Sequence, residues 1–188
     1  DMKAYDFLKK MKEEGKIRHL GFSCHGSQET MHRFIMKNFR HIEFCQIQLN
    51  WFDWKYQNAE AKVALLNEYK VPIWVMEPVR GGRLVNLDEA HVAKLNGLRP
   101  GVSNPEWAFR FLQSIEGVTM VLSGMSNMEQ LQDNIRTFEQ RKSLNEEETK
   151  AVFEVAEGLK NTVPCTACRY CVDGCPMGLD IPTYISVL

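Results

Sequence analysis

Short apolar runs alternate with amphipathic segments four times along this 188-residue chain, and this alternation constrains its fold more than any other feature. The runs predicted as strands are IRHLGFS (17–23), EFCQIQLNW (43–51), VPIWVMEP (71–78) and VTMVLSG (118–124). The run at 71–78 is apolar without alternation, which suits a parallel strand buried on both faces. Four strand–helix units predict an α/β protein with a parallel sheet and helical crossovers.

Helices are expected around these strands, because apolar residues recur there at helical spacing. The segments SNPE (103–106), SNME (126–129) and SLNE (143–146) have the spacing of capping boxes and mark three helix starts. The expected helices cover residues 2–14, 59–70, about 88–95 and 127–138, with others beginning near 28, 103 and 143. The last helix ends near residue 160, so we predict one domain over residues 1–160 and a separate segment over residues 161–188.

Two architectures fit four strand–helix units. One is part of an open, doubly wound sheet, and the other is half of a (β/α)8 barrel, which typically needs about 250 residues. Hydrophobic periodicity does not choose between them. The chain starts inside a helical pattern and without Met, so the barrel alternative predicts a preceding N-terminal half.

The composition excludes several classes of function. The chain has 44% hydrophobic and 25% charged residues and a net charge of −1, so it offers no electrostatic basis for binding nucleic acid. No apolar run approaches the roughly 18 residues of a membrane span, and the charged N-terminal segment is unlike a signal peptide. We therefore expect a cytoplasmic protein, in which clustered cysteines are more often metal ligands than disulfides.

The segment CTACRYCVDGCP carries four cysteines with the spacing C-x2-C-x2-C-x3-C-P. This is the spacing of the cluster-binding loops of bacterial ferredoxins. It predicts one 4Fe–4S cluster held by Cys165, Cys168, Cys171 and Cys175. Zinc, disulfides and unligated thiols are less favoured alternatives, since zinc sites usually separate two CxxC pairs by a dozen residues or more. Cys24 and Cys45 are expected to be buried apolar cysteines.

The segment VLSGMSNMEQLQDN (121–134) predicts a strand, a glycine-containing turn and a capped helix start. Backbone N–H groups at such a turn can hold a phosphate, because they and the helix dipole favour an anion. Helix capping without a ligand is the simpler alternative.

Four segments resemble, in order and spacing, the C-terminal half of the aldo-keto reductases. They are GKIRHLGFS (15–23), FCQIQLNW (44–51), VMEPVRGGRL (75–84) and VLSGMSNMEQLQDNI (121–135). With the cysteine segment, they are most similar to the bacterial branch that carries a C-terminal 4Fe–4S ferredoxin-type motif. The resemblance implies an α/β fold comprising strands five to eight of a (β/α)8 TIM barrel, followed by a small ferredoxin-like iron–sulfur segment.

The same resemblance implies a nicotinamide cofactor at the carboxyl ends of the strands. The implied cofactor-binding residues are Ser23 and Gln46 at the carboxamide, Met76 near the ring, Glu77 and Val79 at the pyrophosphate, and Gly124, Ser126, Gln130, Asp133 and Asn134 around the adenosine phosphate. The chain has Gly124 and Gln130 where NADP-preferring members have Lys or Arg, so the cofactor is NADP(H) or NAD(H).

The resemblance places the catalytic Asp, Tyr, Lys and His of the family before residue 1, so we assign no catalytic residue within this chain. Arg80 and Arg83 are candidates for phosphate contacts or solvated loop residues. His25 is a candidate for substrate contact, and Trp51 and Trp54 for the wall of a substrate pocket or for packing.

Three functions remain open. The first is an NAD(P)H-dependent oxidoreductase that acts on a small carbonyl or alcohol, with a cluster that relays electrons to a redox protein partner or stabilises the C-terminus. The second is a non-enzymatic ferredoxin-like module on a vestigial barrel. The third is an inert truncated fragment.

Overall fold

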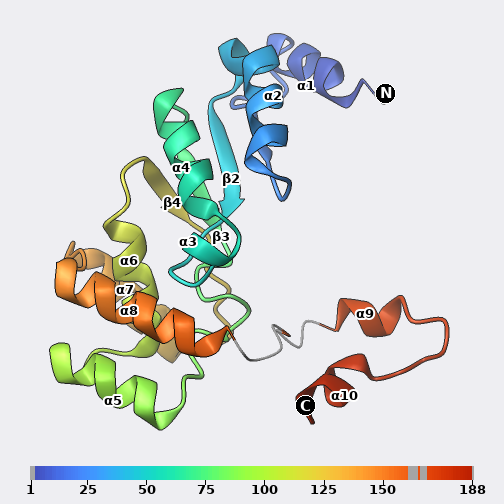
Figure 1. The fold of residues 1–188 in the computed structure, drawn as a ribbon. Coiled ribbons are helices and arrows are strands. Elements are labelled where there is room, and N and C mark those ends of the chain that lie inside the picture. The colour runs from blue at the N-terminus through green and yellow to red at the C-terminus, as the bar shows by residue number, and fades with distance from the viewer. Residues whose placement is uncertain (1–2, 161–164, 166–168, 188) are drawn as a thin grey trace.

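The computed structural model describes residues 3–160, 165 and 169–187. A single sheet runs through it with the strand order β1-β2-β3-β4, and every neighbouring pair is parallel (Figure 1). The strands are β1 (Gly21–Ser23), β2 (Phe44–Gln48), β3 (Ile73–Met76) and β4 (Val118–Val121). The predicted α/β class and parallel sheet are confirmed, and the arrangement is consistent with part of a TIM barrel.

Helices connect consecutive strands, as parallel pairing requires. The longer helices are α1 (Ala4–Glu13), α2 (Gln28–Asn38), α4 (Ala59–Glu68), α5 (Glu89–Leu98), α6 (Asn104–Gln113), α7 (Met128–Glu139) and α8 (Glu146–Leu159). The shorter ones are η1 (Phe39–His41), α3 (Asp53–Tyr56), α9 (Tyr170–Asp173) and α10 (Ile181–Ser186). In Figure 1, α6 lies beside α7 and α5 beside α8, while α9 and α10 pack on each other.

Two of the three predicted helix starts are displaced by one or two residues, and the strands are shorter than predicted. Ser103 caps α6 as predicted, and its Oγ accepts a hydrogen bond from the N–H of Glu106 at 3.2 Å. At α7 the cap is Asn127 instead of Ser126, because the amide oxygen of Asn127 accepts from the N–H of Gln130 at 2.9 Å.

The start of α8 is also displaced, by two residues. Asn145 is its cap, and its side chain and that of Glu148 each accept a backbone N–H of the other residue at 2.9 Å. Ser143 instead donates its hydroxyl to the carbonyl of Gln113. The reciprocal capping box of Asn145 and Glu148 satisfies two backbone donors, so a helix start at Asn145 is favoured over one at Ser143.

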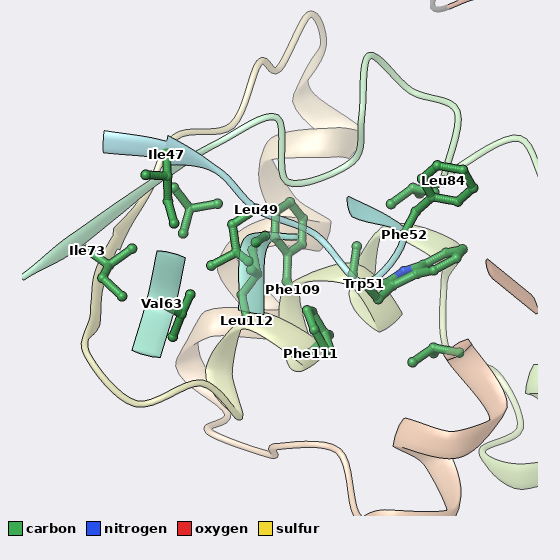
Figure 2. Packing of buried hydrophobic residues seen from close by; sticks show 14 of the residues in the cluster. Ile47, Leu49, Trp51, Phe52, Val63, Ile73, Leu84, Phe109, Phe111 and Leu112 are labelled. Atoms are coloured by element: carbon green, nitrogen blue, oxygen red, sulfur yellow. The ribbon is translucent and has the colours of Figure 1, made fainter. Parts of the chain in front are cut away.

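One face of the sheet is buried under the helices. Cys45, Ile47, Ile73 and Val75 are fully buried and pack with side chains of α4 and α6, including Val63, Phe109 and Leu112 (Figure 2). Since side chains alternate along a strand, the opposite face carries Gln46, Gln48, Trp74 and Met76. Burial of Cys24 and Cys45 is confirmed.

The sequence predicts that this third strand is buried on both faces. The structure fully buries only one face of β3. Ile73 and Val75 are fully buried, whereas Trp74 and Met76 are half-buried. The ring of Trp74 stacks on that of Phe44 from β2, with centroids 3.8 Å apart. This stack covers part of the second face without help from a helix.

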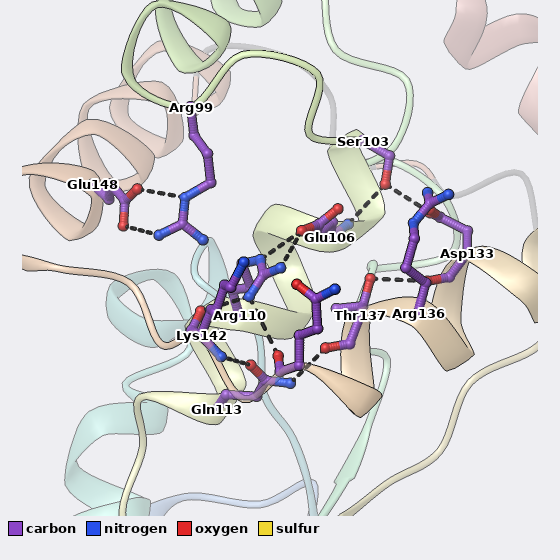
Figure 3. A network of polar contacts seen from close by, with 11 residues as sticks. Arg99, Ser103, Glu106, Arg110, Gln113, Asp133, Arg136, Thr137, Lys142 and Glu148 are labelled. Carbon is purple, nitrogen blue, oxygen red and sulfur yellow. Dashed lines mark hydrogen bonds and ion pairs between the residues drawn. The ribbon is translucent and has the colours of Figure 1, made fainter.

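Two ion pairs, one buried and one half-buried, lie among the helices (Figure 3). Within α6, Arg110 pairs with Glu106 and its Nη1 also donates to the carbonyl of Lys142 at 2.9 Å. Arg99 and Glu148 form a bidentate pair at 2.7 Å, which ties the end of α5 to α8.

Over the part of the chain that the structure describes, no helix combines the length and apolarity needed to cross a membrane.

We predict that Glu106→Ala destabilises the fold strongly, because it leaves the Arg110 guanidinium buried without its carboxylate. Removing one partner of a buried ion pair costs about 3–5 kcal/mol of the free energy of unfolding. Urea unfolding measures this loss. Glu154→Ala, which removes an exposed partner of Lys94, is the control and should cause no comparable change. Equal effects of the two substitutions would contradict the prediction.

Candidate functional site

A cavity of about 900 Å³ lies at the carboxyl ends of β3 and β4. The loop after β3 forms one wall, from Glu77 to Asn86, and the turn after β4 and most of α7 form another, from Leu122 to Arg136. Ser103, Pro105 and Phe109 from α6 and its cap complete the lining. The volume is in the range of small-molecule sites, and the carboxyl ends of parallel strands are the usual place for one.

The structure brings six of the predicted cofactor-binding residues to this cavity. They are Glu77, Val79, Gly124, Gln130, Asp133 and Asn134. Ser126 lies between two lining residues, and its backbone N–H donates to the side chain of Gln130 at 2.7 Å. The side chain of Asn134 donates to the hydroxyl of Ser123, which also lines the cavity, at 3.0 Å.

The three remaining predicted residues form a separate group on the sheet. Ser23 of β1 is in register with Gln46 of β2, and the Gln46 side-chain amide donates to the Met76 sulfur at 3.7 Å. None of the three lines the cavity. The predicted carboxamide and ring contacts therefore lie together, beside the cavity and not in its wall.

Two helix N-termini border the cavity. The residues at the start of α6, Ser103 and Pro105, and the cap of α7, Asn127, all line it. Both helices are ten residues or longer, so their dipoles place partial positive charge at this wall. Such a wall favours an anionic group of a ligand.

The charged side chains in the lining are mostly acidic. Glu77, Glu129 and Asp133 contribute carboxylates, and Arg136 is the one cation among the described lining residues. Asp133 accepts from the Ser103 hydroxyl at 2.7 Å and pairs with Arg136, as Figure 3 shows. The only guanidinium in the wall is therefore already engaged by a carboxylate.

The loop arginines do not reach this cavity, contrary to one expectation from the sequence. Arg80 is 5% exposed, and its Nε lies 3.1 Å from both carboxylate oxygens of Asp53. Arg83 donates to the carbonyl of Leu159 at 3.0 Å, and burial together with nearby Arg80 lowers its pKa. Arg80 is buried and Arg83 is half-buried, each bound to other parts of the protein, and neither lines the cavity.

Other candidates from the sequence lie outside the cavity lining as well. His25 is exposed. Trp51 is 1% exposed and belongs to the core, and Trp54 packs edge-on against Phe111 at 5.6 Å between ring centroids. For the two tryptophans, packing is the observed role.

Sequence reasoning missed several residues of the site. Ser103 and Glu129 were predicted only as parts of helix-capping segments, and Arg136 was not considered. Asp53 was passed over inside the segment NWFDW, although an acidic residue among three aromatic neighbours is itself a signal of a buried polar contact. Its partner, Arg80, comes from a distant loop, and only the tertiary structure shows the pair.

The cysteine segment is described in part. Cys165 and Cys175 are half-buried and Cys171, on α9, is exposed, whereas Cys168 lies outside the described residues. Within the described ranges, no three side chains of metal-binding type converge on one point. Hydrogen bonds from the backbone N–H groups of Leu179, Met177 and Gly178 lower the pKa of the Cys175 thiol. This environment suits a thiolate, which is the form that binds iron.

Comparison with known proteins places the chain in a family. Residues 2–157 match the aldo/keto reductase family. An uncharacterized oxidoreductase, YqkF of Bacillus subtilis (strain 168), is 28% identical, with 77% of this chain and 52% of that protein covered. The chain therefore belongs to the aldo/keto reductase family.

Solved structures share the fold. The aldo-keto reductase AKR11C1 from Bacillus halodurans, in its holo form, is 20% identical with a TM-score of 0.62, covering 78% of this chain and 53% of that one. The thermostable aldo-keto reductase Tm1743, in complex with the inhibitor epalrestat, is 19% identical with a TM-score of 0.64, covering 79% and 52%. The chain thus spans about half the length of the relatives it matches.

We predict that Cys175 reacts with iodoacetamide before Cys45 does in protein freed of metal. The amide hydrogen bonds that lower the Cys175 pKa produce its thiolate below the ordinary pKa of about 8.5, whereas burial raises the pKa of Cys45. Mass spectrometry of alkylated peptides from pH 6 to 9 measures both rates. A Cys175 midpoint at or above that of an unperturbed thiol would contradict the prediction.

Proposed function

We propose that this chain is the cofactor-binding part of an NAD(P)H-dependent oxidoreductase that moves hydride between the nicotinamide and a small carbonyl or alcohol. The observation that carries the proposal is the cavity at the carboxyl ends of β3 and β4, bordered by the starts of α6 and α7. Membership of the aldo/keto reductase family supports it. The chain would represent strands five to eight of a (β/α)8 barrel.

The residues of the chain would bind and orient the cofactor. The helix N-termini would face its phosphates, and Gly124, Gln130 and Asn134 would surround its adenosine part. Gln46 presents an amide next to Met76, and Ser23 presents a hydroxyl beside Gln46 on the neighbouring strand. These polar groups suit a carboxamide. When bound, the nicotinamide supplies or accepts the hydride, and the chain fixes its position.

We further propose that the cofactor is NAD(H) in preference to NADP(H). Three carboxylates line the cavity, and its single arginine is paired with Asp133. The 2′-phosphate of NADP(H) adds negative charge, and it binds best to unpaired arginine or lysine side chains. A wall of this charge therefore disfavours the phosphorylated cofactor.

We predict that the purified protein binds NADH more tightly than NADPH and that Glu129→Lys narrows the difference. The substitution turns a lining carboxylate into a cation, so NADPH should gain more affinity than NADH. Quenching of tryptophan fluorescence by each dinucleotide measures the dissociation constants.

Glu116→Lys is the matched control, because Glu116 is exposed, precedes β4 and does not line the cavity. It should leave the ratio of the two constants unchanged. Tighter binding of NADPH by the unmodified protein would contradict the preference for NAD(H). Binding of neither dinucleotide would contradict the function itself.

For the C-terminal segment we propose one 4Fe–4S cluster bound by Cys165, Cys168, Cys171 and Cys175. The ligand spacing supports it, as do the amides that lower the pKa of the Cys175 thiol. We propose residues 161–188 as a unit distinct from residues 1–160. The cluster would either relay single electrons to a redox protein or stabilise the C-terminal segment.

We predict that protein purified without oxygen contains iron and sulfide and that Cys175→Ser loses both. Loss of a thiolate ligand weakens binding of the cluster, so the visible absorption should fall with the iron content. Cys24→Ala is the control, because Cys24 is buried in the core, and it should keep the iron. Iron-free wild-type protein would contradict the proposal, and bleaching by NADH or NADPH alone would support electron relay.

A further inference from the structure

Asp53, at the start of α3, is a fully buried charge that the proposed binding function does not use. Its Oδ2 accepts from the side-chain amides of Gln48 and Asn50, each at 2.8 Å. Its two oxygens also lie 3.1 Å from the Nε of Arg80. A buried carboxylate is tolerated only with such partners, so these four residues act as one cluster.

The Arg80 side chain contacts two aromatic rings and does not line the cavity. Its guanidinium lies over the ring of Phe52, 4.5 Å from the centroid, and 5.5 Å from the ring centroid of Tyr56. The neighbours of Arg80 in the chain, Val79 and Gly81, line the cavity, while Arg80 itself does not. The ion pair between Arg80 and Asp53 therefore contacts the 77–86 loop on the side that does not line the cavity.

The backbone of that loop needs to be held. Glu77 and Arg80 have φ values of 56° and 51°, in the left-handed region that non-glycine residues rarely adopt. Such a conformation persists only when surrounding contacts enforce it. The Asn50 amide donates to the carbonyl of Glu77 at 2.9 Å, and the Arg80 N–H donates to the same carbonyl at 3.1 Å. The cluster thus fixes both ends of the first turn.

We propose that Asp53 and Arg80 are positioning residues for the cavity: their buried ion pair holds the 77–86 loop in the shape that binds a dinucleotide. The part of this inference that concerns the ligand rests on the proposed function. The part that concerns the loop stands on the described contacts alone.

The direction in which dinucleotide affinity changes when Asp53 is substituted distinguishes a positioning role from a direct electrostatic effect. Asp53→Asn removes a negative charge near the cavity, and by charge alone it should strengthen the binding of an anionic dinucleotide. Loss of positioning should weaken it, because the loop would sample other conformations in the free protein. The two explanations therefore predict opposite changes.

The test measures NADH affinity and amide hydrogen exchange in the unmodified protein and in Asp53→Asn. We expect binding at least about 10-fold weaker, which corresponds to about 1.4 kcal/mol. We also expect faster exchange confined to residues 77–86. Arg80→Lys is the second variant, in case Asp53→Asn does not fold. It keeps the charge but loses the guanidinium over the Phe52 ring and its Nε contact with Asp53, so it should act in the same direction.

Glu148→Gln is the matched control. It removes one carboxylate from the bidentate pair with Arg99, where Glu148 is 5% exposed and neither residue lines the cavity. We expect it to lower the unfolding temperature while NADH affinity stays within about twofold of the unmodified protein, since loss of a buried charge affects stability first.

Each outcome decides one claim. Unchanged exchange in residues 77–86 of Asp53→Asn and Arg80→Lys would overturn the positioning role. Faster loop exchange with unchanged or tighter NADH binding would also overturn it, because the loop would then not govern the cavity. Faster loop exchange in a protein whose unmodified form binds no NADH would support the hold on the loop and overturn the proposed function instead.

Discussion

Parallel pairing of the four strands is the constraint on which the rest of this structure depends. It places every strand's carboxyl end at the same edge of the sheet, so the loop after β3 and the turn after β4 meet there. The helical crossovers then return the chain with the starts of α6 and α7 at that edge. The cavity is a consequence of this topology more than of any single residue.

The burial of one face of the sheet fixes that edge in space. Ile47, Ile73 and Val75 pack under α4 and α6, and a shift of one residue in register would turn them to the other face. Because α6 is held by the core through Phe109 and Leu112, its N-terminus is a rigid border of the cavity. The loop after β3 is held at its far end by Leu84, which is buried in the core, and at its start by the buried contact between Asp53 and Arg80.

The electrostatics of the cavity combine two opposing features. The helix dipoles attract anionic groups, whereas the carboxylates of Glu77, Glu129 and Asp133 limit how much negative charge the lining accepts. The hydroxyl of Ser103 and the guanidinium of Arg136 hold the Asp133 side chain in place, so its negative charge is fixed in the cavity lining. This balance is the basis of the proposal that the cavity accepts a dinucleotide without a 2′-phosphate in preference to one that carries it.

The amino-acid sequence by itself determined the α/β class, the order of the elements and the region of the cavity, because periodicity, caps and glycines act over a few residues. The resemblance to a known family also predicted Glu77, Gly124, Gln130 and Asp133 as cofactor-binding residues, and the structure places these four in the lining of one cavity. Helix starts near 126 and 143 were displaced, since several polar side chains compete for the same backbone donors. Only the tertiary structure decided the roles of Asp53 and Arg80, whose contact spans 27 residues of sequence, and turned the arginines away from the cavity. The physical reason is that burial and long-range pairing depend on how distant elements pack, which no local pattern encodes.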